Sequence, residues 1–257
     1  MAFQKGLDKV QASAERSNSN YSGGSSRYIG WKAGQVKTIR FLTDGDEVVL
    51  TNLHEFVTCH DGTKRSFVCR AEIKQECPLC DDGAKKREVA YGIAVEREES
   101  KKDGKTVFVT KVEEAEVEED GKTVTKVVPV VGILHQAPRN FWAGAGIYDA
   151  FEKRGTLLDR DYTITRRGAK LDTTYTAYAE DVSEMDLSKF DEFKPDLEEL
   201  LTRQASKQYY DKFLYGIEET KDGDKPSSDS ELTQEDLETI KAANVEVAAT
   251  ASSGDWD

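Results

Sequence analysis

Apolar and polar residues alternate in short runs along most of the chain from Tyr28 onward, and turn sequences separate these runs. Three strands and two turns are predicted within GQVKTIRFLTDGDEVVLTNLHEFVTCHDGTKRSFVCR, where runs rich in Val, Ile, Thr and Phe are broken by TDGD and CHDGT. Further strands are predicted in REVAYGIAVERE and, around Asp-Gly turns, in TVFVTKVEEAEV and TVTKVVPVVGIL. A hairpin is predicted in DYTITRRGAKLDTTYTAYAED. This part of the chain is therefore mainly β.

Two segments have helical spacing instead. The first is PRNFWAGAGIYDAFEKRG, with Pro138 near its start and Gly155 as its C-cap. The second is the amphipathic segment DLEELLTRQASKQYYDKFLYG, which Gly216 closes. Many short strands with few helices favour a small β-barrel with insertions and a C-terminal helix over a βαβ alternation.

Composition divides the chain into three parts. Residues 1–27 are polar and rich in Ser, Asn and Gly, which predicts a flexible N-terminal arm. Residues 28–216 form the predicted core, and residues 217–257 form an acidic C-terminal tail. No run of eighteen apolar residues and no signal-peptide pattern occurs, so we expect no membrane span and a cytoplasmic location.

The net charge of −13 is concentrated in two segments. Residues 216–257 hold 12 acidic and 3 basic residues, and residues 96–122, a predicted hairpin-like excursion, hold 10 acidic and 6 basic residues. The rest of the chain is therefore neutral overall. It can present local basic faces despite the acidic total.

All four cysteines lie within HEFVTCHDGTKRSFVCRAEIKQECPLC, residues 54–80. If Asp61-Gly62 is the tip of a two-residue hairpin, His54 lies directly opposite Cys69. Cys59 would then be about 16 Å from Cys69 along the ladder and on the other face of the strand. The CPLC sequence places two thiols with the spacing that tetrahedral zinc sites use.

These positions predict one structural zinc ion (Zn2+) bound by His54, Cys69, Cys77 and Cys80. Four protein ligands leave no open position for water, so the ion would stabilise the fold. An alternative ligand set uses Cys59 in place of His54, because a one-residue bulge would change the register. Free buried cysteines and a redox-active pair are further alternatives, although no βαβ context surrounds the CxxC sequence.

The stretch VKTIRFLTDGDEVVLTNLHEF, followed by a cysteine and CPLC, resembles the core of the single-stranded DNA-binding (helix-destabilising) protein of T-even-type tailed bacteriophages and its relatives. The resemblance covers residues 36–95 well and extends weakly through FWAGAGIYDAFEK, residues 162–178 and SEMDLSKF. It implies an OB-fold β-barrel with a zinc-binding subdomain at about residues 50–90 and a basic, aromatic-lined cleft. It also implies an N-terminal arm for self-association along DNA and an acidic tail for replication and recombination partners. The N-terminal arm lacks a tight Lys-Arg-Lys cluster, and residues 96–122 have no counterpart in that family.

Basic and aromatic residues suited to single-stranded DNA gather in three stretches of the predicted core. The candidates are Tyr28, Trp31, Lys37, Arg40, Lys64, Arg65, Phe67, Arg70, Arg166, Arg167, Lys170, Tyr175 and Tyr178. Arg40 lies between Ile39 and Phe41 in a strand and points away from them, which favours a ligand-facing role. The alternative to a DNA-binding role is a position in the hydrophobic core for Trp31 and a solvated loop for Arg166-Arg167.

The expected function is sequence-independent binding of single-stranded DNA during phage DNA replication, recombination and repair in the infected bacterial cell. The alternative is a zinc-ribbon protein-interaction adaptor that binds no nucleic acid. An enzyme is not expected, because the chain has no Gly-rich phosphate loop and no nucleophile elbow.

Overall fold

The computed structural model describes residues 3–9, 28–119, 122–169 and 172–217. The chain divides into two compact units, Met1–Glu218 and Glu219–Asp257, and every described residue belongs to the first. Most of the predicted acidic tail and residues 10–27 of the predicted arm therefore lie outside the described residues.

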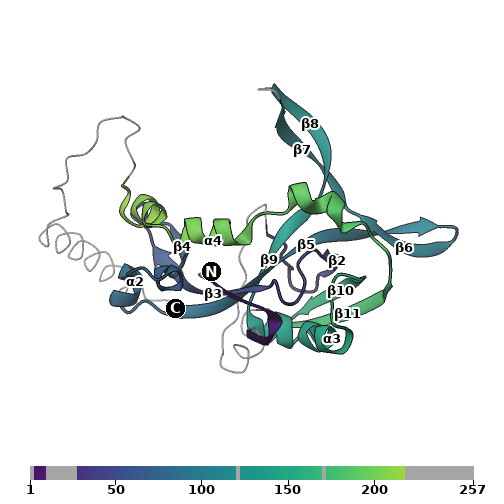
Figure 1. Ribbon diagram of the computed structural model, residues 1–257, viewed down its shortest axis with the longest axis horizontal. Helices are drawn as coiled ribbons and strands as arrows, with labels where there is room; N and C mark the ends of the chain where they lie inside the picture. The colour runs from purple at the N-terminus through teal and green to yellow at the C-terminus, as the bar shows by residue number, and fades with distance from the viewer. Residues whose placement is uncertain (1–2, 10–27, 120–121, 170–171, 218–257) are drawn as a thin grey trace, which may run out of the picture. The chain divides into compact units, whose positions relative to one another are not determined.

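Antiparallel strands dominate the described fold, and nine of them form one sheet in which β1, β3, β5, β2, β10 and β11 follow one another (Figure 1). β4 adds to β3, and both β6 and β9 add to β5. The strands of this sheet are β1 (Gln4–Lys5), β2 (Val36–Phe41), β3 (Val49–Thr58), β4 (Lys64–Val68), β5 (Lys86–Lys102), β6 (Lys105–Thr110), β9 (Val131–Gln136), β10 (Arg160–Arg167) and β11 (Thr174–Val182).

The long strand β5 organises this sheet. One of its edges pairs first with β3 and then with β2, and its other edge pairs first with β9 and then with β6. Alternate residues of β5 belong to two different hydrophobic cores. Ala90 and Ala94 pack in the first core, and Val89 and Tyr91 pack in the second. Burial on both faces explains why residues 89–95, the part of β5 within these cores, carry no charged side chain.

The predicted mainly β class with added helices is confirmed, but the predicted closed OB-fold barrel is not. Among the described residues β11 pairs only with β10 and β1 pairs only with β3, so the two ends of the sheet do not join. The far end of β5 pairs with β6 and leaves the body of the sheet, as Figure 1 shows. The sheet is therefore open in the described part of the chain.

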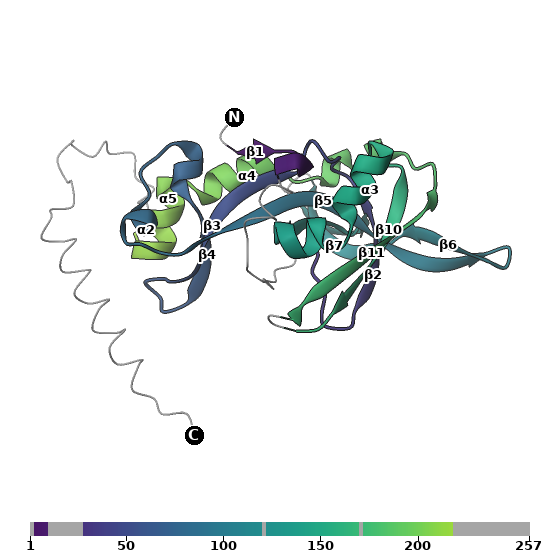
Figure 2. The ribbon, with the colours of Figure 1, turned by 90° about the horizontal axis from the view of Figure 1, so that it is seen from below.

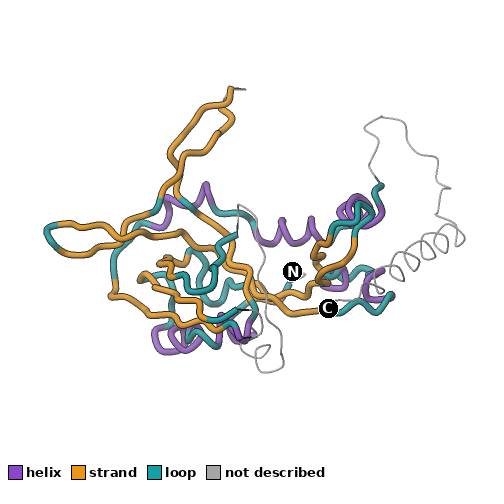
Figure 3. The backbone as a smooth tube through the Cα atoms, turned by 180° about the vertical axis from the view of Figure 1, so that it is seen from behind, coloured by secondary structure: helices purple, strands orange, loops and turns teal. Residues whose placement is uncertain are grey.

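Helical segments contribute residues to both cores, and Figures 2 and 3 show where these segments lie beside the strands. The first core includes Phe141 and Trp142 from the π-helical turn η2 (Pro138–Ala143) and Ile147 from α3 (Ile147–Arg154). The second core receives residues from η4 (Leu187–Phe193) and α4 (Leu197–Gln204). Gly92 of β5 lies close to the Trp142 ring of η2. A Cβ at this position would lie 2.9 Å from that ring, so the close packing requires glycine.

Both predicted helices are interrupted. Gly144 and Gly146 separate η2 from α3, and Gly155 ends α3 with a φ of 76° as its predicted C-cap. Residues 196–216 form α4, then α5 (Lys207–Tyr210) and the π-helical turn η5 (Asp211–Tyr215). The interruption has a local cause, since the Ser206 side chain accepts a hydrogen bond from the Tyr209 N–H and so starts a new helix.

The predicted excursion at residues 96–122 consists of two hairpins. β5 and β6 meet at Asp103-Gly104, where both φ angles are positive, as a tight primed turn requires. β7 (Val112–Glu119) and β8 (Lys122–Pro129) form a separate two-stranded ribbon, which projects from the sheet (Figure 1).

The first described residues change one predicted boundary, that between the N-terminal arm and the core. Residues 3–9 are not a free arm, because β1 pairs with β3 and the side chains of Phe3 and Leu7 are buried. Phe3 and Leu7 are four residues apart, so both apolar side chains can pack on the same side of the chain, although most residues of the predicted arm are polar. No helix in the described part of the chain is long and apolar enough to cross a membrane.

Candidate metal centre and surrounding surfaces

The four predicted metal ligands come from three neighbouring elements. His54 belongs to β3, and Cys69 follows the end of β4, where its N–H donates to the carbonyl of Asn52 at 2.9 Å. The 3-10 turn η1 (Arg70–Ile73) then leads to the short helix α2 (Pro78–Asp81), which carries Cys80 and has Cys77 as its N-cap. Pro at the first helical position favours this tight turn, so the two thiols of the CPLC sequence lie close together.

The ligand atoms of these residues lie within 4.8 Å of one another. The Sγ atoms of Cys69 and Cys80 are 3.4 Å apart, and His54 Nε2 is 3.4 Å from Cys77 Sγ and 3.5 Å from Cys80 Sγ. Tetrahedral metal–sulfur bonds of about 2.3 Å place neighbouring ligand atoms roughly 3.5 to 3.8 Å apart. The geometry and the donor set, three thiols and one imidazole, therefore fit a metal ion.

Burial controls the protonation of these ligands. It raises the pKa of the Cys69 thiol to about 12 and lowers the pKa of His54, which favours the neutral imidazole that binds metals. Burial also acts to raise the pKa of Cys77, but hydrogen bonds from the Arg70 and Cys80 backbone outweigh it and leave this pKa below its usual value. A divalent cation would compensate the negative charge of three thiolates, of which those of Cys69 and Cys77 are buried.

Cys59 is not part of the ligand group, as predicted, but the predicted register is wrong. His54 pairs with Phe67, and beyond an irregularity in β3 Val57 pairs with Arg65. The turn has three residues, His60 to Gly62, closed by the Cys59 N–H donating to the Thr63 carbonyl at 2.8 Å, with Gly62 at a φ of 76°. A three-residue loop with a left-handed glycine is a common alternative to the two-residue turn.

A C-terminal helical segment seals the metal centre. Tyr210 of α5 is 1 % exposed, donates a hydrogen bond to the Val68 carbonyl at 2.8 Å, and has its hydroxyl 3.8 Å from Cys77 Sγ. Its ring packs at 5.0 Å from that of Phe67, and the Arg70 guanidinium lies 5.7 Å from its centroid. The amphipathic pattern of residues 196–216 indicated a packed helix but not that it packs on the metal centre.

Three predicted DNA-stacking aromatics belong to the core instead. Trp31 and Tyr175 are buried in the first core, and Trp31 Nε1 donates to the Ile164 carbonyl at 3.1 Å. Phe67 is fully buried beside the metal ligands. Their flat rings fill the space between elements, so none of the three is open to a base.

Three predicted phosphate-binding cations are also engaged within the protein. Arg40 points away from the first core, as predicted, but it is 1 % exposed and its Nε lies 2.8 Å from Asp161 Oδ1. Arg166 is buried and donates hydrogen bonds to the Trp31 carbonyl and to Thr173 Oγ1. Lys37 forms an ion pair with Glu96. These contacts correct the predicted ligand-facing roles of Arg40 and Arg166.

The other candidates retain some exposure, apart from Lys170, which lies outside the described residues. Tyr28 is half-buried with its ring 5.7 Å from that of His135, and Arg65 and Arg70 are half-buried against Phe213 and Tyr210. The exposed candidates are Lys64, Arg167 and Tyr178.

Tyr178 is 67 % exposed on the face of the sheet opposite the first core. Across the strands its neighbours are Thr163 of β10 and then Thr38 of β2, whose hydroxyls are 2.9 Å apart. Thr165 and Thr176 pair with each other on the same face, and the exposed Arg167 ends β10. Glu180 shares this face, and its Oε1 accepts a hydrogen bond from Thr163 Oγ1 at 2.6 Å. The tyrosine therefore projects from a polar floor that carries threonines and one carboxylate.

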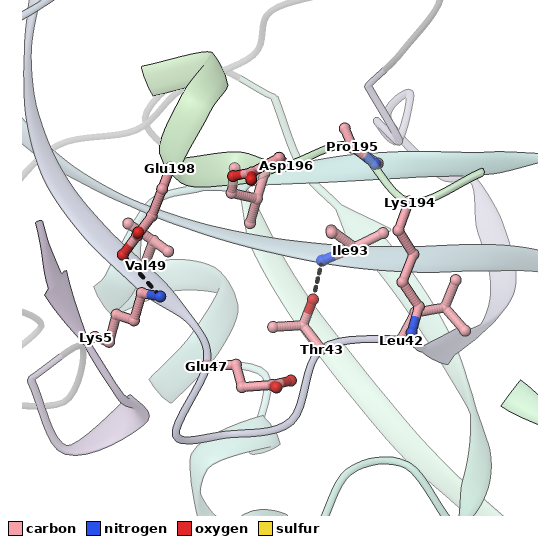
Figure 4. A pocket seen from close by; sticks show the side chains of 11 residues that line it. Lys5, Leu42, Thr43, Glu47, Val49, Ile93, Lys194, Pro195, Asp196 and Glu198 are labelled. Carbon is pink, nitrogen blue, oxygen red and sulfur yellow. Dashed lines mark hydrogen bonds and ion pairs between the residues drawn. The ribbon is translucent and has the colours of Figure 1, made fainter. Parts of the chain in front are cut away.

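A cavity of about 410 Å3 lies where β1, β3 and β5 meet the start of α4 (Figure 4). Its charged groups are partly paired, since Lys5 Nζ lies 2.8 Å from Glu198 Oε1. At its floor the Ile93 N–H donates to Thr43 Oγ1 at 2.8 Å. The lining contains no histidine or cysteine.

The metal centre and the Tyr178 face are thus two features of the described chain with chemistry that a function can use. Comparison of the chain with models of protein families, with curated proteins and with solved structures finds no match.

Proposed function

We propose that this protein binds single-stranded DNA without sequence preference and acts in phage DNA replication, recombination and repair in the cytoplasm of the infected bacterial cell. The observation that carries the proposal is the open sheet face, on which exposed Tyr178 projects above small threonines with Arg167 at its end. Proteins of this kind combine aromatic rings, on which bases stack, with cations that follow the phosphates. The role is binding and not catalysis.

The metal in this proposal is a single zinc ion. Thiolates and imidazole are the ligands that zinc prefers in structural sites, and the order of ligands along the chain is the one that the phage family resemblance implies. When bound, the ion supplies folding energy to the hairpin of β3 and β4 and has no open position for a reactant. His54 and the three thiols hold it, and Tyr210 excludes water from it.

The proposed fold is a partly open OB-type barrel. In support, β5 is long enough to pair with two successive strands on each edge, as a strand of a small barrel does. The proposed partners are single-stranded DNA, further copies of the chain through the N-terminal arm, and replication and recombination proteins through the acidic tail. Residues 10–27 and 218–257 lie outside the described residues.

A fluorescence titration with oligo-dT at two salt concentrations tests the proposal. Affinity should fall steeply as salt rises, because phosphate binding releases counterions. Tyr178→Ala should weaken binding by roughly 1–3 kcal/mol, the usual value of one stacked base. Val182→Ala, at an equally exposed position of the same strand, is the control and should bind as the unaltered protein does. Equal affinity for duplex and single strand would refute the proposal.

A second candidate function is a metal-stabilised protein-interaction adaptor. The ribbon of β7 and β8 supports it, because Val112 and Val127 are exposed there at 51 % and 67 % and both strands lie outside the main sheet. An exposed two-stranded ribbon can accept a further strand from a partner. Deleting residues 112–129 would abolish partner capture under this alternative, and it would leave binding of single-stranded DNA unchanged under the first proposal.

A further inference from the structure

Phe56 combines two properties that folding does not favour. Its φ of 56° lies in the left-handed region, which is unusual for a bulky side chain, and the residue is 67 % exposed. Phe56 thus has the strain of a left-handed residue without the benefit of burying its ring. Glycine or asparagine is the ordinary choice where the chain needs this conformation.

The position of the backbone irregularity follows from the metal centre. His54 faces the ligand cluster, and Val57 and Cys59 face the apolar residues around the same cluster. Residues three apart in an unbroken strand point to opposite faces, so His54 and Val57 can share one side only if an extra residue lies between them. The register of β3 with β4 shifts between these two residues, and Phe56 occupies the shift.

The shared side of His54 and Val57 accounts for the bulge at residue 56 but not for the aromatic ring that the bulge carries. Strained residues gather at functional sites, where the surrounding structure holds them in place. Residues paired across strands share a face. Exposed Lys64 pairs with Thr58, two residues beyond Phe56 in β3, whereas Lys86 pairs with His54 on the ligand side of the sheet. The exposed ring is therefore presented near one cation, Lys64.

We propose that Phe56 is a stacking platform for one base of a single-stranded nucleic acid, with Lys64 binding a phosphate next to that base. The inference rests on the proposed function and adds the metal-binding hairpin to the nucleic-acid contact surface. Every base has a flat face, so a phenylalanine platform suits binding without sequence preference.

The test compares oligo-dT with an abasic oligomer of the same length and phosphate count, using the full chain loaded with zinc. Phe56→Leu keeps an apolar side chain but loses the flat ring, and should weaken oligo-dT binding by about tenfold while abasic binding stays unchanged. Phe56→Tyr keeps the ring and should bind oligo-dT as the unaltered protein does. Val127→Ala, which truncates a side chain that is also 67 % exposed, should change neither affinity.

Phe56→Gly provides a variant that should fold at least as well, because glycine relieves the left-handed strain. Its urea midpoint should rise while its preference for oligo-dT over the abasic oligomer falls. If the unaltered protein prefers oligo-dT and Phe56→Leu and Phe56→Gly both keep that preference, the inference is overturned and the proposed function stands. If the unaltered protein binds neither oligomer, both fail.

Discussion

Arg40 and Arg167 have the same charge and belong to paired strands of one sheet, yet only Arg167 is free to meet a phosphate. Asp161 lies directly across from Arg40 in β10, and the two side chains are joined at 2.8 Å. Arg97 approaches the same carboxylate at 3.3 Å. The residue across the strand, and not the basic residue itself, decides whether such a cation is available.

Removing Asp161 should therefore be costly. Asp161→Ala leaves the buried guanidinium of Arg40 without its counter-charge, and a loss of about 3–5 kcal/mol in the free energy of unfolding is expected. Urea denaturation measures it. Asp159→Ala, which removes the partner of the more exposed Arg160, is the control and should cost less than about 1 kcal/mol. Similar losses for both variants would contradict the structural role of Arg40.

The thiols of the metal centre give a second pair of matched variants. Cys77→Ser should lose the metal and lower the thermal midpoint, because the binding energy of a structural ion is folding energy. Cys59→Ser should leave the metal content unchanged, because its buried thiol lies outside the ligand group. Elemental analysis of the purified variants checks both. Loss of metal in Cys59→Ser with retention in His54→Ala would refute the ligand set.

At the scale of elements, α5 stabilises the metal centre through its N-cap. Ser206→Ala removes the acceptor for the Tyr209 N–H and should cost about 1 kcal/mol. Because α5 carries Tyr210, the metal should also transfer faster to a chelator. The control is Asp186→Ala, which removes the N-cap of η4 in the second core. Asp186→Ala should lower stability without changing the rate of chelation. Equal chelation rates in Ser206→Ala and Asp186→Ala would contradict the role of α5 in covering the metal centre.

Glu96 joins β5 to β2 and to the segment before β7, and it makes stability depend on pH. Burial acts to raise its pKa, but hydrogen bonds from Lys111 and Lys37 outweigh burial, and the pKa lies below its usual value. A carboxyl with a lowered pKa in the folded state contributes stability above its unfolded pKa of about 4.3 and loses it as pH falls through the folded value.

Glu96→Gln should therefore be less stable than the unaltered protein near neutral pH, and the difference should shrink as pH falls below about 4. Urea midpoints measured across this range check the prediction. Glu98→Gln, at an exposed position of the same strand, should show no such convergence. A constant difference between Glu96→Gln and the unaltered protein at all pH values would contradict it.

At the scale of the whole molecule, the acidic tail is expected to compete with DNA. Residues 217–257 contain 12 acidic and 3 basic residues and end in SSGDWD. Deleting them should strengthen binding of single-stranded DNA, most at low salt where screening is weakest, and should abolish polymerase or helicase contacts. Metal content should not change. Unchanged affinity at low salt would reduce the tail to a solubility device.

Local signals in the sequence predicted much of this molecule, because they act over a few residues. Apolar alternation located the strands, Asp103-Gly104 located a tight turn, and Gly155 located the end of α3. The ligand group was predictable for the same reason: the CPLC sequence fixes two thiols locally, and one hairpin brings the other two ligands near.

Tertiary structure alone decided the rest. Alternation shows that a strand has two faces, but it does not show what covers each face. Trp31 and Tyr175 therefore entered the core, and Arg40 met Asp161. The bulge that exposes Phe56 arises because both His54 and Val57 must face one cluster, a demand set by packing in three dimensions. The sequence determined which residues could bind a metal or a base, and the fold determined which of them are free to do so.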